Sequence, residues 1–312
     1  MENLIIAANA VLPFIIYIAF GYVIRSLKVA SEEFLRKLNQ IVFKCFFPIL
    51  MFNNFSQMDL GKTLTGRFLL FFLGAFVVVF TLSCVLVPLF VKENPRRGVI
   101  IQALFRSNAI LFALPLAESV AGSEGYMLAS LCVSFTVPLY NVLAVVVLEY
   151  YSGKKPSPLQ LLKKVVTNPL IIGAIAGVIF LLLPFDLPVF LKKPVKAFAD
   201  LTTPLSLFIL GGTLHFSAFG KNMKAILVTM GMKLIFIPLL LVLVSIPLQF
   251  SGTERFVALI FFATPVAVSS YTMAANMGGD DELAGHFVAV STALSLFTLF
   301  GWIFFLKSLQ LI

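Results

Sequence analysis

Apolar runs long enough to cross a lipid bilayer follow one another along almost the whole chain. A helix rises 1.5 Å per residue, so about 20 apolar residues span the hydrocarbon core. We predict ten such spans, near residues 4–25, 34–55, 67–91, 97–119, 125–150, 165–184, 195–216, 222–248, 255–277 and 283–307. The connections are too short to hold a soluble domain. The chain is therefore predicted to be an all-α integral membrane protein with ten transmembrane helices.

The composition favours lipid as the solvent for most of the surface. Of 312 residues, 60% are hydrophobic and 12% are charged, whereas a soluble domain carries roughly 25% charged residues. The net charge is +9. Because the basic residues lie in short loops, they favour a membrane surface over nucleic acid as the partner. Neither a cofactor nor a metal is expected, since the acidic cluster at 278–282 is typical of a turn followed by a helix start.

The distribution of Lys and Arg predicts the orientation in the membrane. Loops after the odd-numbered spans carry thirteen of these residues, and loops on the opposite side carry seven. Cytoplasmic loops are usually the more basic ones. Both termini of this multi-pass protein are therefore expected outside the cytoplasm, in the plasma (inner) membrane. The linker at 151–164 is expected inside the cell, although the basic loop at 192–196 argues against this orientation.

The two halves of the chain resemble each other at a constant shift. Residues 97–124 align with residues 255–282, with an arginine at the start and a glutamate at the end of each stretch. Five spans per half is an odd number, so the halves must enter the membrane from opposite sides. Such inverted repeats are typical of secondary transporters. Residues 1–150 and 165–312 are predicted to be these two repeats; a duplication in another kind of membrane protein is the alternative.

Spans 4 and 9 are interrupted near their middles. Asn108 lies roughly 16 Å along the helix from Arg97, and Pro115 follows it; Pro265 interrupts span 9. Proline lacks an N–H group and clashes with the carbonyl four residues earlier. Free backbone groups are tolerated in a bilayer only where they line a cavity or a site. Two half-helix N-termini meeting at mid-membrane would suit a carboxylate; ordinary packed kinks are the alternative.

Basic and hydroxyl side chains complete the predicted substrate site. Lys44 and Arg106 lie at similar depths in spans 2 and 4, where a charge costs about 2.5–3.5 kcal/mol unless it is offset. An anionic substrate would offset it, and so would snorkelling or a structural pair with Asp200. The third buried cation, Lys233, is expected to be structural. Candidate substrate-binding residues are Lys44, Arg106, Ser107, Asn108, Pro115, Pro265, Ser269, Ser270 and Tyr271.

Five stretches spread over the chain carry a family resemblance. They are LNQIVFKCFFPILMF (38–52), SNAILFALPLAES (107–119), TNPLIIGAIAGVIF (167–180), FADLTTPLSLFILGGTL (198–214) and TPVAVSSYTMAANMGGDDELAG (264–285). Together they resemble the auxin efflux carrier family, in particular its bacterial malate- and malonate-permease-like members.

The resemblance implies a fold and a site. In the plant PIN-type carriers of the family, helices 4 and 9 cross at their broken midpoints. Their asparagine followed by a proline seven residues later matches Asn108 and Pro115, and their crossover proline matches Pro265. Asn108 is thereby implied to hold a substrate carboxylate. Helices 1, 2, 6 and 7 would form a scaffold that also makes a homodimer, and helices 3–5 and 8–10 would form a moving transport domain.

The chain departs from the family and its relatives in two respects. Ser270 stands where the plant pattern has a second proline. The related bile-acid symporters bind sodium with acidic and amide groups near the span-9 crossover, and no acid lies between Pro265 and Tyr271 here. Sodium coupling is therefore less expected.

The function predicted from the sequence is secondary transport of a small organic anion, malate- or malonate-like or auxin-like, by elevator-type alternating access. An anion channel is the alternative, and a sodium- or proton-coupled symporter of the bile-acid type is a further one. An enzyme is not expected, because no nucleophile–base pair or pair of aspartates lies within the spans.

Overall fold

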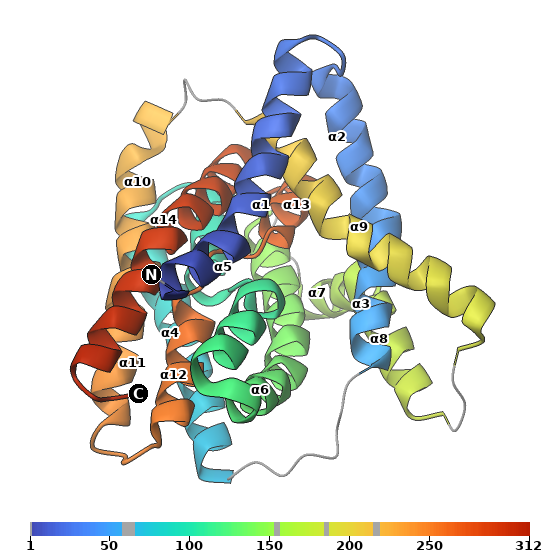
Figure 1. Cartoon of the computed structure of the whole chain (residues 1–312). Coiled ribbons are helices and arrows are strands. Elements are labelled where there is room, and N and C mark those ends of the chain that lie inside the picture. The colour runs from blue at the N-terminus through green and yellow to red at the C-terminus, as the bar shows by residue number, and fades with distance from the viewer. Residues whose placement is uncertain (1, 58–65, 153–156, 184–186, 215–218) are drawn as a thin grey trace.

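The computed structural model describes residues 2–57, 66–152, 157–183, 187–214 and 219–312, and this part of the chain is helical (Figure 1). The helices are α1 (Glu2–Ser26), α2 (Glu32–Ile41), α3 (Phe47–Ser56), α4 (Gly66–Phe90), α5 (Asn94–Phe105), α6 (Leu114–Tyr151), α7 (Pro158–Val166), α8 (Pro169–Leu181), α9 (Val189–Thr213), α10 (Phe219–Gly231), α11 (Ile237–Ser245), α12 (Gly252–Ala263), α13 (Ser269–Asn276) and α14 (Asp281–Ser308). The all-α prediction is confirmed. Of the predicted linker at 151–164, residues 153–156 lie outside the described part.

Long apolar helices support a membrane protein. In the described chain, four are long and apolar enough to cross a bilayer: Gly66–Phe90, Ala109–Tyr151, Gly220–Ser245 and Asp281–Ser308. The pair α7 and α8, bent by 61°, is a fifth candidate. The structure thus supports up to five of the ten predicted spans. Of the others, Leu12–Ser26 of α1 counts as a shorter apolar helix, and α9 contains charged residues.

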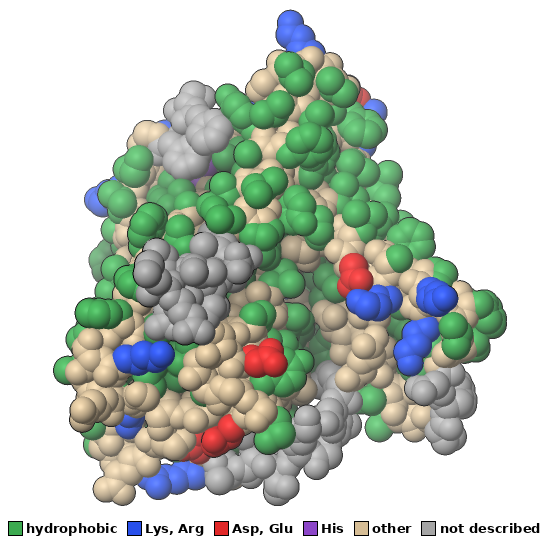
Figure 2. Space-filling model, viewed as in Figure 1, with side chains coloured by type: hydrophobic (Ala, Val, Ile, Leu, Met, Phe, Trp, Pro, Cys, Tyr) green, Lys and Arg blue, Asp and Glu red, His purple; other side chains and the backbone are tan. Residues whose placement is uncertain are grey.

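The surface has the character that lipid requires. Hydrophobic side chains cover much of the face shown in Figure 2. Large apolar residues are strongly exposed on α4, where Phe90 is 83% and Leu70 is 76% exposed, and on α14, where Phe304 is 65% exposed. Extended apolar surface of this kind marks contact with a membrane or a partner.

In the part of the chain that the structure describes, three π-helical turns interrupt the helices: Val42–Phe46 between α2 and α3, Ala109–Ala113 before α6, and Met232–Phe236 between α10 and α11. Each turn is followed within two residues by a proline, namely Pro48, Pro115 or Pro238. Proline cannot donate to the carbonyl four residues before it and clashes with that group. The wider turn moves the carbonyl away, so the chain passes the proline without a full break.

A positive-φ glycine bends α6. Gly122 has φ 65°, a left-handed conformation that only glycine adopts without strain, and it divides α6 into two helical parts. This bend lies at the predicted turn between spans 4 and 5, which confirms that turn.

One group of helices is held together by close backbone contacts. α1 packs along α9, and α3 packs against α8 and α9. Gly211 of α9 lies against the carbonyl of Ile18 in α1, and Gly173 of α8 lies against the backbone of Pro48 in α3. Since lipid is as apolar as the side chains, close packing through small residues is a main source of helix association in membranes.

The remaining helices pack through phenylalanine. α4 contacts α5, α6 packs against α5 and α12, and α14 packs against α10. Phe72 of α4 meets Phe261 of α12 edge-on at 5.0 Å between ring centroids, and Phe76 of α4 meets Phe105 of α5 at 5.7 Å. α14 also packs against α1, so the two groups of helices share an interface.

Gly211→Ala is expected to destabilise the folded protein by about 1–3 kcal/mol, because the added methyl group would overlap the Ile18 carbonyl and force α1 away from α9. The measurement is thermal unfolding of the purified protein in detergent. Gly301→Ala in α14 is the control, since a Cβ atom there has no neighbour within 4 Å. Equal unfolding temperatures for the two variants would contradict the close α1–α9 contact.

Candidate functional site

The two interrupted segments meet. α5 ends at Phe105, and α12 ends at Ala263. Beyond these ends the chains run antiparallel, with a bridge between Ser107 and Val266. The N–H of Asn108 donates to the carbonyl of Pro265 at 2.9 Å. The predicted breaks near Asn108 and Pro265 are therefore confirmed, and each break satisfies part of the hydrogen-bonding capacity of the other.

The local sequence explains the second break better than the first. The residue before a proline is biased toward extended backbone, and Thr264 has φ −70° and ψ 155°. In span 4 the interruption was predicted over residues 108–115. The structure begins it earlier, at Arg106, which is extended with φ −92° and ψ 114°. Residues Ala109–Ala113 are already helical, because the π-helical turn accommodates Pro115.

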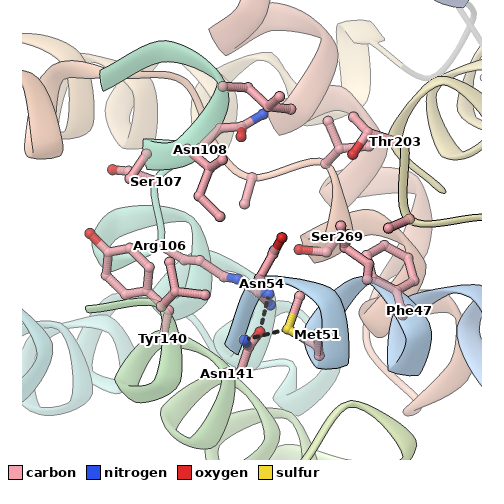
Figure 3. Close-up of a pocket in the computed structure, with 18 of the residues that line it drawn as sticks. Phe47, Met51, Asn54, Arg106, Ser107, Asn108, Tyr140, Asn141, Thr203 and Ser269 are labelled. Atoms are coloured by element: carbon pink, nitrogen blue, oxygen red, sulfur yellow. Dashed lines mark hydrogen bonds between the residues drawn. The ribbon is translucent and has the colours of Figure 1, made fainter. Parts of the chain in front are cut away.

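A cavity of ≈ 410 Å³ lies beside this junction (Figure 3). Its walls come from α1, α3, α6, α9 and the two breaks. The lining is largely apolar, with Phe14, Phe47 and Met51 among its residues, and its polar members are Tyr17, Asn53, Asn54, Arg106, Ser107, Asn108, Tyr140, Asn141, Asp200, Thr203 and Ser269. A mostly apolar pocket with a few converging polar groups is typical of a site for a small molecule.

Arg106 supplies the buried positive charge of this cavity and is 3% exposed. Its guanidinium donates to Oδ1 of Asn141 at 2.7 Å (Figure 3). It also donates to the sulfur of Met273. No ion pair of Arg106 with a carboxylate occurs among the described residues. The suggested structural pair with Asp200 is wrong, since Asp200 pairs with Lys196 at 2.7 Å.

The nine predicted site residues fall into three groups, and the first of these groups lines the cavity. Arg106, Ser107, Asn108 and Ser269 line the cavity. Pro265 contributes the carbonyl that holds Asn108, and Pro115 lies in the first turn of α6. The remaining three do not line the cavity: Ser270 and Tyr271 are buried, with Tyr271 hydrogen-bonded to Thr213 of α9, and Lys44 is exposed.

The position of Lys44 corrects its expected place in the site. In a regular helix Lys44 would share a face with Phe47, Met51 and Asn54, which line the cavity. The π-helical turn Val42–Phe46 inserts one residue. One residue corresponds to a rotation of about 100°, so the side chain of Lys44 points away from the cavity.

Lys233, which the sequence predicts to be structural, lies next to the cavity wall. It is fully buried, and its Nζ donates to the hydroxyl of Ser107. Asn54 and Asn141 were also missed, although an amide inside an apolar run is the available signal for an interior polar position.

The acidic cluster is structural. Asp280 caps α14 by accepting from the N–H of Leu283 at 2.9 Å. Across the described residues, no group of three or more His, Cys, Asp or Glu side chains is placed to hold a metal ion.

A sequence profile described as "Membrane transport protein" matches residues 6–303. The chain therefore belongs to this family of membrane transporters, the auxin efflux carrier family. Membership makes it a multi-pass membrane protein and a transporter rather than an enzyme.

Similar proteins match over nearly their whole length. An "Uncharacterized transporter" of Methanothermobacter thermautotrophicus is 25% identical over 304 residues, covering 95% of this chain and 97% of the relative. A "Putative malonate transporter" of Rhizobium meliloti is 24% identical over 305 residues, covering 96% and 95%. An uncharacterized transporter of Methanocaldococcus jannaschii is 25% identical over 315 residues, covering 96% and 99%.

Ser291→Ala is expected to destabilise the protein by about 1–3 kcal/mol, because the buried N–H of Val266 donates to the Ser291 hydroxyl at 3.0 Å and would lose its partner. Ser295→Ala on the same helix is the matched control, since its hydroxyl bonds a carbonyl within α14. Thermal unfolding in detergent measures both. A Ser291→Ala protein as stable as the control would show that the break does not depend on this bond.

Proposed function

We propose that the protein is a secondary transporter of a small organic anion, a carboxylate such as malonate or malate or an auxin-like acid, which binds in the cavity at the junction of the two breaks. The observation that carries the proposal is Arg106, a buried guanidinium that faces the cavity with an amide and a thioether as its side-chain partners. A buried charge without a counter-ion is costly, and an anionic ligand offsets that cost. The name of the Rhizobium meliloti relative agrees with this ligand class.

Neutral groups around Arg106 suit the same ligand. The amide of Asn108 and the hydroxyls of Ser107 and Ser269 line the cavity and can donate to carboxylate oxygens. The turn that starts at Ala109 and the helix that starts at Ser269 both begin at the cavity wall. Helix N-termini carry free N–H groups and a positive partial charge, which favour anions.

The proposal includes ten transmembrane helices in two inverted five-helix repeats. The shift of 158 residues that aligns Arg97 with Arg255 also aligns Ser107 with Pro265 and Asn108 with Val266. The two breaks therefore fall at corresponding positions of the proposed repeats, and they meet each other. Two breaks that meet at corresponding positions are what a two-fold axis through the junction would produce.

The helix packing supports a division into two bodies. α1, α2, α3, α8 and α9 would be the scaffold, and α4–α6 with α10–α14 would be the transport domain. The cavity lies between them, with walls from α1, α3 and α9 on one side and from α6 and the breaks on the other. In an elevator cycle the second body carries the bound anion past the first. A homodimer formed through the scaffold, as the family resemblance implies, is part of the proposal.

Contacts at one end of this interface fit a closed gate. Arg36 of α2 pairs with Asp281 of α14 at 2.7 Å, and Thr213 of α9 bonds Tyr271 of α13. The cavity lies toward the opposite ends of these scaffold helices, where Tyr17 of α1 and Thr203 of α9 line it. With both termini outside the cytoplasm, the cavity would be open to the outside of the cell, and the gate contacts would close it toward the cytoplasm. A reporter fused to the C-terminus tests the orientation.

Arg106→Gln is expected to weaken carboxylate binding roughly 10- to 100-fold, the effect of losing a hydrogen bond to a charged group, about 1.5–3 kcal/mol. A thermal-shift screen of carboxylates selects the substrate, and counterflow into proteoliposomes measures its half-saturation. Lys44→Gln is the control and should match the wild type. Saturable counterflow separates a carrier from a channel. An unchanged half-saturation in Arg106→Gln would remove Arg106 from the site.

A cross-link between positions 36 and 281 is expected to stop counterflow, because it would tie the proposed scaffold to the proposed transport domain. The cysteine pair replaces Arg36 and Asp281 in a background with Cys45, Cys84 and Cys132 changed to serine, and a short bis-maleimide, which adds to both thiols, joins it. A pair replacing Glu32 and Arg36, both on α2, is the control. Transport that continues through the first cross-link would rule out relative movement of these helices.

A further inference from the structure

A lysine lies behind the wall of the cavity, in the π-helical turn Met232–Phe236. Lys233 is 0% exposed, and its Nζ meets the hydroxyl of Ser107. Ser107 also lines the cavity. One hydroxyl group therefore separates the amine from the space in which the anion is proposed to bind.

The groups that face Lys233 offer it no negative charge. Arg106 precedes Ser107 in the chain and directs its guanidinium toward Asn141, and the phenol of Tyr140 also lines the cavity (Figure 3). The turn packs against α5, α10, α11, α12 and α14. Their titratable groups are Arg96, Arg97, Lys221, Lys224, Glu254, Arg255, Asp281, Glu282, His286 and Lys307.

The acids of these helices are engaged elsewhere. Glu254 caps the start of α12 through the N–H of Ser251 at 2.9 Å, Asp281 pairs with Arg36, and Glu282 accepts from Asn222 at 3.4 Å. Lys233 thus shares the junction with Arg106, another cation, and no carboxylate of the described chain pairs with it.

Two neighbouring cations in a water-poor environment disfavour each other, and desolvation disfavours both. Arginine keeps its proton in proteins, whereas a buried lysine gives its proton up readily. In the empty site the favourable arrangement is a charged Arg106 and a neutral Lys233 amine that is hydrogen-bonded to the Ser107 hydroxyl. An anion in the cavity reverses the balance, because its negative charge stabilises a second cation nearby.

We propose that Lys233 is a proton-binding site of the transport cycle, which takes up a proton when a carboxylate enters the cavity and releases it when the carboxylate leaves. The inference rests on the proposed function, since it requires an anion in the cavity. Ser107 provides the route: its hydroxyl oxygen receives a proton from the cavity while its own proton passes to Nζ. The serine is regenerated, and the amine becomes an ammonium that balances one negative charge of the substrate.

The consequence for transport is electrical. A proton carried with the anion cancels one unit of its charge. An inside-negative membrane potential opposes anion uptake with an energy proportional to the net charge that moves. Carrying the proton with the anion lowers that net charge by one.

Calorimetry of malonate binding tests the inference. The purified protein is titrated with malonate at one pH, at which both malonate carboxylates are ionised, in two buffers of different ionisation enthalpy. The wild type is expected to take up about one proton per malonate bound, and its affinity is expected to fall by up to about tenfold per pH unit as the pH rises, as linkage between two ligands requires.

Two variants test whether Lys233 is the group that takes up the proton. Lys233→Met and Lys233→Arg are both expected to bind malonate without proton uptake, and Lys233→Arg, with its fixed charge, is expected to bind with an affinity independent of pH. Lys224→Met, an exposed lysine on α10, should behave as the wild type.

The outcomes separate the inference from the proposed function. Malonate binding without proton uptake by the wild type overturns the role of Lys233, and so does undiminished proton uptake by Lys233→Arg. The same titration with other mono- and dicarboxylates is carried out if malonate gives no heat. Absence of binding by every carboxylate overturns the proposed function, and the proton site with it.

Discussion

The backbone hydrogen bond from Asn108 to Pro265 joins two segments that lie far apart in the sequence and could not otherwise leave the helical state inside a bilayer. Each segment has backbone groups that no helix satisfies, and hydrocarbon offers them no partner. The antiparallel bridge of Ser107 and Val266, with the hydroxyl of Ser291 behind it, supplies the missing partners. Arg106, Ser107 and Asn108 are held in place beside the cavity because this junction exists.

The charges near the junction follow from the same constraint. Arg106 and Lys233 approach it from α5 and from the turn between α10 and α11, and both meet neutral polar groups. A soluble protein would place a carboxylate or water beside them. Here the bound substrate is proposed to supply the negative charge. The free-energy cost of leaving these cations without a counter-ion in the empty site then favours the binding of an anion. The contacts Arg36–Asp281 and Thr213–Tyr271 join the two helix groups without using either of these charges.

The sequence predicted the elements whose causes are local. Apolar runs specify helices, and Pro265 specifies an extended Thr264 and hence the end of α12. The bend at Gly122 was also visible, because a glycine-rich turn interrupts the apolar pattern there. What the sequence could not supply depends on rotation and distance. Counting residues along span 2 predicts how deep Lys44 lies, but the π-helical turn determines the direction of its side chain.

Lys233 and the junction both depend on packing between segments that are distant in the sequence. Nothing around Lys233 in the sequence indicates that its amine reaches Ser107, since that contact depends on how α10 packs against α5. The junction itself consists of main-chain atoms, with a peptide N–H on one strand and a peptide oxygen on the other. The bond between the two segments therefore uses no side-chain atom of Asn108 or Pro265. Related transporters could change the side chains that select the substrate and keep the same backbone crossing of the two segments. This is one way for distant relatives to differ in substrate while sharing an architecture.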